Sequence, residues 1–327
     1  MMYRSIRNIP VKLCCVLLAA VMLLCGCDNG QPAEITETTE ITDSGIAPIN
    51  ISGEVFQLGG KSAEAAELSD YPVIINNTTI NEKPKTAICL SSSLTEIIYE
   101  LGYGSRLIGR GSYCEYPEAV KALNDFGRPA APDLDAVKNA SPDVLITATA
   151  IPNIDSVALS DLGIKVVYIP SPHSLDEFGR IYKAIGMIFD GLFDGEENGN
   201  RVFSEIRSSL ETSGISLGKF IYVTEGLSIA GGDTFENAVL SLFGTNIASG
   251  ASGYIAYSEL AADVQPDVVL LNSELGTDEI SSDERLGALA AVQSGNIIKI
   301  SNSCFESPTG QITELLEELS KAEETAQ

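Results

Sequence analysis

Short apolar runs alternate with helix-like segments along most of the chain, and this alternation constrains the fold more than any other feature. In the first region the strand-like runs cover residues 71–75, 86–90, 107–109, 144–146 and 166–169. Helix-compatible stretches separate them, and one begins at Ser93-Leu94-Thr95-Glu96, which has the pattern of a capping box. Strands that alternate with helices predict a mainly parallel sheet covered on both faces.

A second region repeats this layout toward the C-terminus. Its strand-like runs cover residues 220–223, 268–271 and 297–300, and helices are predicted over 234–242 and 312–321. Between the regions, residues 174–213 carry apolar side chains at helical spacing, with breaks expected at Gly191 and Gly195. The predicted fold class is therefore α/β, with two Rossmann-like lobes joined by a long helical linker that would limit hinge closure.

The two regions share a pattern in which an acid precedes a Pro-Asp pair by seven residues. Asp135 precedes Pro142-Asp143, and Glu259 precedes Pro266-Asp267; each pair opens an apolar strand. Local structure explains part of this, because an acid in a first helical turn complements the helix dipole and proline ends a helix. It does not require an acid at the same place in both lobes. Paired acids could instead contact two basic sites on a two-fold symmetric partner.

The first residues read as an export signal. A basic start is followed by an apolar run over 13–24, which is too short to span a bilayer comfortably, and then by Leu24-Cys25-Gly26-Cys27. This ending resembles a bacterial lipobox, which implies a signal peptide over 1–26 and lipidation of Cys27. A plain cleaved signal or an uncleaved anchor is the alternative. Residues 27–70 then predict an acidic tether.

Composition excludes several classes of function. The chain has 20 Lys and Arg against 45 Asp and Glu, a net charge of −25, which argues against binding to nucleic acid. A single histidine, His173, argues against a zinc or manganese site, and its expected role is capping or solvent exposure. Beyond the leader only Cys89, Cys114 and Cys304 remain, so a framework of several disulfides is excluded. Neither a phosphate-binding loop nor a nucleophile elbow is present, so we expect no enzyme, no metal and no cofactor.

Several segments in order carry a family resemblance. They include residues 84–96, Leu101-Gly102-Tyr103-Gly104, Ser112-Tyr113-Cys114-Glu115-Tyr116-Pro117, Gly231-Gly232-Asp233-Thr234-Phe235 and the two Pro-Asp blocks. Together they resemble the iron-siderophore/vitamin B12 family of ABC-importer substrate-binding proteins, and the Ser-Tyr-Cys-Glu-Tyr-Pro segment is most similar to the vitamin B12-binding branch. The resemblance implies a ligand cleft between the lobes.

The resemblance also implies roles for individual residues. Tyr113 matches a tyrosine that lies against the corrinoid, whereas Tyr254, Phe305 and Glu306 fall in loops that line the cleft. Asp135 and Glu259 match the acids that meet arginines of the permease; Asp135 is shorter than the commoner Glu, which would weaken that contact.

The chain also departs from the B12-binding branch. Relatives there often use tryptophans in the cleft, and this chain has none; Ala148 and Ser228 fall near those positions. Arg128 could pair with an anionic ligand, although a solvated surface charge is the simpler interpretation.

These observations predict a lipid-anchored, extracytoplasmic binding protein at the outer face of the cytoplasmic membrane. It would capture a corrinoid and deliver it to the permease dimer and ATPase subunits of an ABC importer. A ferric siderophore or haem is the alternative ligand, and a sensor module without transport is the alternative role. The predicted domains are 1–26, 27–70, an N-terminal lobe over 71–173, the linker over 174–213 and a C-terminal lobe over 214–327.

Overall fold

The computed structural model describes residues 69–260 and 265–325. The predicted signal peptide, nearly all of the tether and the lipidation site Cys27 lie outside these residues. No helix within the described ranges combines the length and the apolar character needed to cross a membrane.

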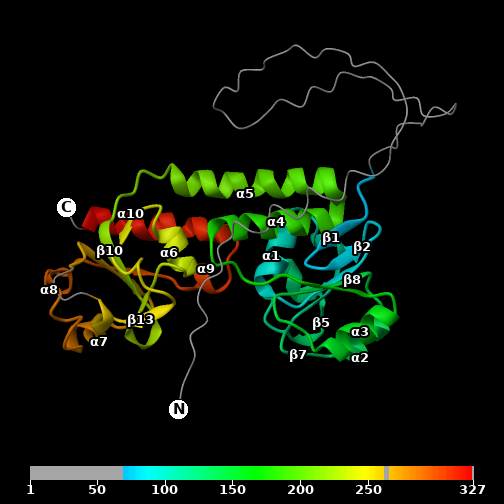
Figure 1. The fold of residues 1–327 in the computed structure, drawn as a ribbon, viewed down its shortest axis with the longest axis horizontal. Helices are drawn as coiled ribbons and strands as arrows, with labels where there is room; N and C mark the ends of the chain where they lie inside the picture. Colours follow the sequence, from blue (N-terminus) through cyan, green and yellow to red (C-terminus); the bar gives the residue numbers. More distant parts are fainter. Residues whose placement is uncertain (1–68, 261–264, 326–327) are drawn as a thin grey trace, which may run out of the picture. The chain divides into compact units, whose positions relative to one another are not determined.

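The N-terminal lobe is built on a five-stranded sheet in the order β5-β4-β3-β8-β9, in which every pairing is parallel. The strand order reverses direction between β3 and β8, as in Rossmann-like sheets. The predicted α/β fold class is therefore confirmed for this lobe (Figure 1). Its strands are β1 (Val73–Ile75), β2 (Thr78–Ile80), β3 (Ala87–Cys89), β4 (Leu107–Arg110), β5 (Asn124–Asp125), β6 (Gly127–Arg128), β7 (Ala131–Pro132), β8 (Val144–Thr147) and β9 (Lys165–Tyr168); its helices are α1 (Ser92–Glu100), α2 (Leu134–Ala140) and α3 (Asn153–Asp161), with 3-10 turns η2 (Gly104–Arg106) and η3 (Glu118–Ala122).

The start of α1 differs from the predicted capping box. The chain is still paired in the sheet at Leu90, whose N–H donates to the carbonyl of Ile146, so the helix begins directly after the strand. Ser91, in an extended conformation, is the N-cap, and its hydroxyl accepts from the N–H of Leu94. The Ser93–Glu96 prediction was therefore wrong by two residues, and the carboxylate of Glu96 is free to make contacts elsewhere.

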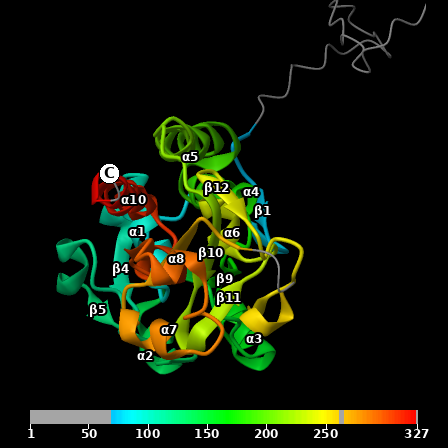
Figure 2. The same ribbon diagram turned by 90° about the vertical axis from the view of Figure 1, so that its left-hand side faces the viewer.

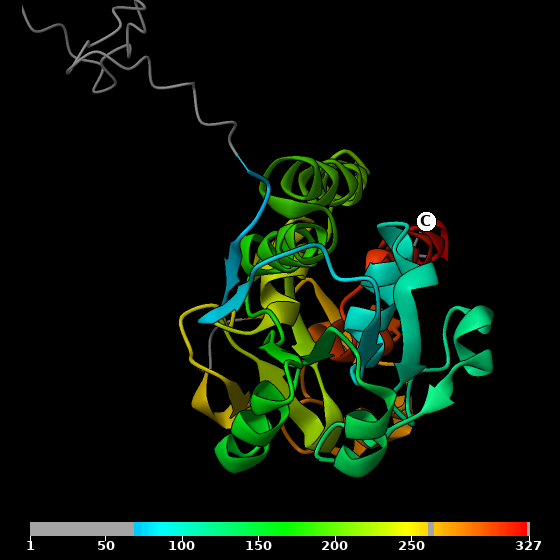
Figure 3. The same ribbon diagram turned by 90° about the vertical axis from the view of Figure 1, so that its right-hand side faces the viewer.

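The linker is a helical hairpin. Helix α4 (Leu175–Asp190) begins at Ser174, whose hydroxyl accepts from the N–H of Glu177 at 3.2 Å, and a π-helical turn η4 (Gly191–Gly195) leads into α5 (Glu196–Glu211). The predicted break at Gly191 is confirmed, because its φ of 85° is not helical and the chain turns back there. The predicted break at Gly195 was wrong: this residue keeps helical angles (φ −69°, ψ −42°), and it is needed instead for the close approach to Gly186. Figures 1 and 3 show α4 and α5 lying side by side along the two lobes.

The C-terminal lobe holds a six-stranded sheet in the order β13-β11-β10-β14-β15, with β12 also paired to β10 (Figure 2). The predicted strands β10, β14 and β15 are confirmed and run parallel, whereas β11 and β13 add antiparallel strands that the sequence did not predict. Its strands are β10 (Gly218–Val223), β11 (Ser228–Ala230), β12 (Gly244–Asn246), β13 (Tyr254–Ala256), β14 (Val268–Asn272) and β15 (Ile297–Ile300); its helices are α6 (Phe235–Leu240), α7 (Thr277–Ser282), α8 (Ala290–Gln293), α9 (Ser303–Glu306) and α10 (Leu315–Thr325), with 3-10 turns η5 (Glu225–Leu227), η6 (Tyr257–Glu259) and η7 (Gly310–Glu314).

One continuous apolar core joins both lobes through the linker. Phe178 of α4 is fully buried, and its ring makes edge contacts with Phe203 of α5 and with Phe235 of the C-terminal lobe at centroid distances of 5.4 and 5.6 Å. Tyr103 of the N-terminal lobe stacks on Phe189 of α4 at 5.1 Å. Because a close-packed core resists relative movement, this packing favours a stiff connection between the lobes.

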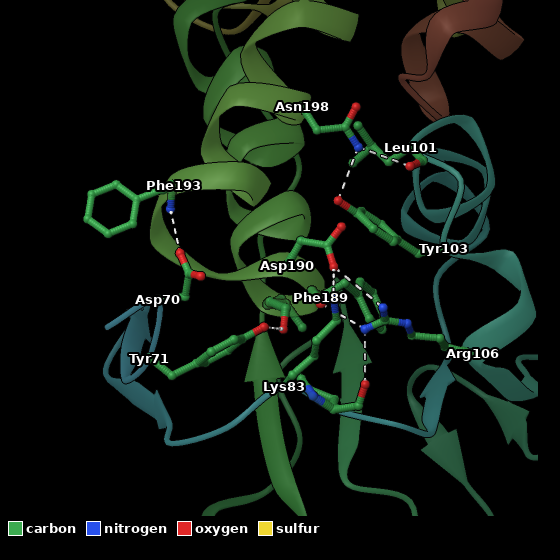
Figure 4. Close-up of polar contacts among 12 residues, drawn as sticks. Asp70, Tyr71, Lys83, Leu101, Tyr103, Arg106, Phe189, Asp190, Phe193 and Asn198 are labelled. Atoms are coloured by element: carbon green, nitrogen blue, oxygen red, sulfur yellow. Dashed lines mark hydrogen bonds and ion pairs between the residues drawn. The ribbon is translucent and has the colours of Figure 1, made fainter. Parts of the chain in front are cut away.

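A polar network fixes the end of α4 to the N-terminal lobe (Figure 4). Arg106 donates to the carbonyls of Phe189 and Pro84 at 2.7 and 3.2 Å, and it pairs with Asp190, as does Lys83. The last carbonyls of a helix lack partners within the helix, and positive charge is favourable there, so Arg106 satisfies both needs.

The repeated Pro-Asp aspartates have the same structural role in both lobes. A carboxylate oxygen of Asp143 accepts from the N–H groups of Lys85 and Thr86 at 2.7 and 2.9 Å, just before β3. A carboxylate oxygen of Asp267 accepts from the N–H of Lys219 in β10 at 2.8 Å. The aspartates thus tie the start of each lobe's central strand to its neighbour, which explains this half of the repeat without a functional role.

Candidate ligand-binding site

A cavity of about 430 Å³ lies at the carboxyl ends of the parallel strands in the C-terminal lobe. In open α/β sheets this edge is where ligands bind. Three of the four residues predicted to bind ligand meet here, although they come from separate segments of the chain. The lining consists of Thr224, Glu225, Ser228, Glu236, Tyr254, Asn302, Phe305 and Glu306.

Tyr254 and Glu236 form one wall of this cavity. Tyr254 of β13 keeps 56% of its surface exposed, and its hydroxyl donates to a carboxylate oxygen of Glu236 at 2.7 Å. Glu236 lies in the first turn of α6 and is only 7% exposed. Burial, with this carboxylate beside it, raises the pKa of Tyr254, so the phenol stays protonated and remains a hydrogen-bond donor.

The Gly231-Gly232-Asp233 motif sets the position of that wall. The N–H groups of Gly231 and Gly232 donate to the carbonyls of Gly253 and Ala251, at 2.8 and 2.7 Å. A Cβ on Gly232 would lie 2.0 Å from the carbonyl oxygen of Ser249, so only glycine permits this approach. The carboxylate of Asp233 accepts hydrogen bonds from the Ser252 hydroxyl and from the Gly253 N–H, and these bonds lower the pKa of Asp233. The two bonds hold in place the segment that leads into Tyr254.

The opposite wall follows β15. The hydroxyl of Tyr222 donates to the side-chain oxygen of Asn302 at 2.9 Å, and the Asn302 amide donates to Glu306 at 2.8 Å. Phe305 packs against the Tyr222 ring at a centroid distance of 5.5 Å and is 7% exposed, so it presents only a small apolar surface to the cavity. Burial, followed by the nearby Glu236, raises the pKa of Tyr222.

Tyr113 lies on the other lobe and does not line this cavity. It follows β4 at the carboxyl edge of the N-terminal sheet, where the Ser92 hydroxyl donates to its carbonyl at 2.8 Å. Its side chain is 60% exposed. The structure therefore groups Tyr254, Phe305 and Glu306 in one lobe and leaves Tyr113 as an exposed aromatic group at the matching edge of the other.

Hydrogen bonds join the two lobes directly beside the linker. Glu100 of α1 accepts from the N–H of Gly310 at 2.9 Å and from the hydroxyl of Tyr182, and Glu96 accepts from the Gln311 amide at 3.1 Å. Burial raises the pKa of Glu96 to about 7; a hydrogen bond from Thr309 opposes this rise, and other carboxylates nearby add to it. This network could not be predicted from the sequence, because its contacts to Gly310 and Gln311 join residues more than 200 positions apart.

The two predicted docking acids are both exposed. Asp135 lies in the first turn of α2, its side chain is 90% exposed, and it pairs with Lys138 at 3.3 Å. Glu259 ends η6, and its carboxylate accepts from the N–H of Ala256 at 3.0 Å. Figure 1 shows α2 and β13, which adjoin these acids, at the ends of the lobes away from α4 and α5.

The sequence analysis missed several cavity residues. Nothing in the sequence marked Glu236 or Asn302 as a binding residue, because an acid in a first helical turn and a polar residue after a strand are both ordinary patterns. Ser228, expected near a cleft position, does line the cavity, whereas Ala148 does not. Arg128 and His173 are exposed. Across residues 69–260 and 265–325, no group of three or more His, Cys, Asp or Glu side chains is arranged to hold a metal ion.

Two α/β lobes, a stiff helical linker and a cavity at a sheet edge define a two-lobed solute-binding protein. The chain belongs to the periplasmic binding protein family, whose model matches residues 88–303. This confirms the predicted family and fold, and it assigns a binding role outside the cytoplasm rather than an enzymatic one. In this family the bound molecule is transported cargo and not a cofactor.

Individual relatives are distant but match over most of their length. An uncharacterized ABC transporter substrate-binding lipoprotein, YvrC of Bacillus subtilis, is 24% identical over 94% of each chain. A cobalamin-binding protein of Halobacterium salinarum is 23% identical over 80% of this chain and 76% of its own. The crystal structure of a possible iron-binding (periplasmic solute-binding) protein from Staphylococcus epidermidis matches with a TM-score of 0.61 and 22% identity over 74% of this chain and 99% of its own.

Proposed function

We propose that this protein captures a corrinoid between its lobes and delivers it to the permease dimer of an ABC importer with its ATPase subunits. The cavity at the C-terminal sheet edge carries the proposal, because it places the exposed ring of Tyr254, beside the small exposed part of Phe305, at the edge where such folds bind ligands. Tyr113 supplies a further exposed ring on the other lobe. Aromatic rings offer a large contact area to a flat macrocycle, and polar groups fix its orientation.

Two similarities support the ligand and the transport role. The Halobacterium relative is named for cobalamin, and YvrC is named as an ABC transporter lipoprotein. The Leu24-Cys25-Gly26-Cys27 pattern supports lipidation of Cys27, which would hold the protein at the outer face of the membrane through the tether. With the lipid as anchor, the acidic chain needs no basic membrane-binding patch.

Ligand titration tests the first part of the proposal. Purified full-length protein is titrated calorimetrically with cobalamin, cobinamide, haem and ferric siderophores. We expect the corrinoids to bind at or below micromolar concentration and more tightly than the others. If haem or a ferric siderophore binds more tightly, that molecule replaces the corrinoid as the proposed ligand. If none of these compounds binds, the proposed class of ligand is contradicted.

Charge reversal tests the docking role of Asp135 and Glu259. The double variant Asp135→Lys/Glu259→Lys should lose ligand uptake in cells that carry the transporter, while its affinity for the ligand is unchanged. Glu197→Lys, a single charge reversal at an exposed site on α5, should transport normally. Unimpaired uptake by the double variant would reject this docking surface, and unimpaired uptake in cells that lack the transporter would favour a sensor role.

A further inference from the structure

The C-terminal cavity has an unusual charge for a site that binds a chelate. Three carboxylates line it, those of Glu225, Glu236 and Glu306, and no lysine, arginine or histidine is among its lining residues. None of the three glutamates takes part in an ion pair with any residue in the described part of the chain. An anionic ligand placed here would meet like charge without compensation.

The hydrogen bonds among the lining residues also argue against an anionic ligand. The Tyr254 hydroxyl already donates to Glu236, the Asn302 amide to Glu306, and the Thr224 hydroxyl to the carbonyl of Ser228. These potential donors are therefore used within the wall of the cavity. The carboxylate oxygens, which only accept hydrogen bonds, are left to face a ligand.

Glu236 gives the strongest indication. Its side chain is more than nine-tenths buried, and one oxygen accepts from Tyr254. The other oxygen has no hydrogen-bond partner or ion pair within residues 69–260 and 265–325, although the residue lines the cavity. That oxygen is not among the fully buried side-chain atoms that lack a partner, so it opens into the cavity, where a ligand that brings N–H groups can donate to it.

We infer that this half of the site selects a ligand face that is neutral or cationic and rich in hydrogen-bond donors, such as carboxamides or an ammonium group, and that it rejects carboxylate and catecholate faces. The inference rests on the proposed function for the place of binding, but it concerns a separate property. It separates the candidate ligands by charge: amide-bearing corrinoids and cationic hydroxamate chelates fit, whereas haem with free propionates and anionic catecholate chelates do not.

A matched pair of ligands tests the inference. Cobinamide and cobyrinic acid share the corrin ring, but the side-chain amides of the first are carboxylates in the second. With the full chain at neutral pH and low salt, we expect cobinamide to bind at least 10-fold more tightly. The difference should shrink at high ionic strength, because salt screens charge repulsion.

Variants identify the residues responsible. Glu236→Gln/Glu306→Gln removes two charges while keeping the side-chain shapes, and it should reduce the preference for cobinamide by at least 5-fold. Glu197→Gln on the linker removes a charge far from the cavity and should leave the preference unchanged. A preference that persists in the double variant would overturn the assignment to these glutamates.

The ligand outcomes also separate this inference from the proposed function. If cobyrinic acid binds as tightly as cobinamide, charge selection is wrong while the corrinoid proposal stands. If neither corrin binds, ferrioxamine B, a cationic ferric hydroxamate, is compared with an anionic ferric tricatecholate. Tighter binding of ferrioxamine B then supports charge selection and ends the corrinoid proposal, and tighter or equal binding of the catecholate ends both.

Discussion

The close contact between α4 and α5 offers a test in which two physical effects predict opposite signs. Gly186 of α4 faces Gly195 at the turn into α5, and a Cβ at position 186 would lie 2.0 Å from the carbonyl oxygen of Gly195 and 2.8 Å from its carbonyl carbon. Both atoms belong to the backbone, so no side-chain rotation can relieve the overlap. Gly186→Ala must push the two helices apart.

The magnitudes decide which effect wins. Alanine is favoured over glycine within a helix by about 1 kcal/mol, so propensity alone would stabilise the variant. An overlap of more than 1 Å with backbone costs about 3 kcal/mol or more, because the surrounding packing must shift as well. Gly199 makes a similar approach to Lys183 and Tyr182 one turn along, so separation of the helices would also loosen that contact. The expected net effect is a loss of about 2 kcal/mol of unfolding free energy.

Urea denaturation followed by circular dichroism measures this difference. Gly250→Ala is the matched control, because an added Cβ there meets no heavy atom within 4 Å, and its unfolding free energy should be unchanged or slightly raised. If Gly186→Ala were as stable as the unmodified protein or more so, the close contact between the linker helices would be wrong, and with it the stiff connection between the lobes.

Three further predictions concern single side chains. Arg106→Met should lower the unfolding free energy by about 3 kcal/mol, because it leaves the last carbonyls of α4 without their charged donor; a loss below about 0.5 kcal/mol in urea denaturation would show that the network is dispensable. The pKa of Glu96 is raised from 4.5 to about 7, so its stabilising contribution is present below pH 4.5 and is lost as the pH rises through about 7. The stability of the unmodified protein relative to Glu96→Gln should therefore fall between pH 5 and 8, by about 1 kcal/mol once solvent screening at this half-exposed site is allowed for, and a constant difference would contradict the shift. Tyr113→Ala should weaken cobinamide binding at least 10-fold in calorimetry with unchanged circular dichroism, and an unchanged affinity would remove Tyr113 from the site.

The elements that the sequence predicted well are those with a local cause. The apolar runs at β3, β8, β10 and β14 are predictable because a parallel strand buried on both faces must be continuously apolar. Strand β15 lies at the edge of its sheet and leaves Lys299 exposed, so it is recognised from the isoleucines around that lysine instead. The linker is predictable from its helical spacing, and its turn at Gly191 from the glycine there. The central parallel strands of both lobe sheets could therefore be predicted without reference to distant parts of the chain.

The elements that were missed depend on contacts between distant segments. Strand β12 (Gly244–Asn246) has no apolar run, and it forms because β10 offers it parallel pairing partners. The N-cap of α1 is Ser91 and not the predicted Ser93, because pairing in the sheet continues to Leu90 and the helix begins directly after it. Likewise Glu236 becomes a cavity residue only when the glycine turn brings Tyr254 against α6. In each case tertiary geometry, and not local propensity, determines the outcome.

A structure of the full chain bound to cobinamide tests the central claim most directly. We expect the ring to lie between the lobes, with Tyr254 and Glu236 on one side and Tyr113 on the other. A larger hollow of about 740 Å³ lies on the linker, lined by residues 192–204, and it provides a clear contrast. Cobinamide bound at that hollow, with the edge of the C-terminal sheet left empty, would contradict the account.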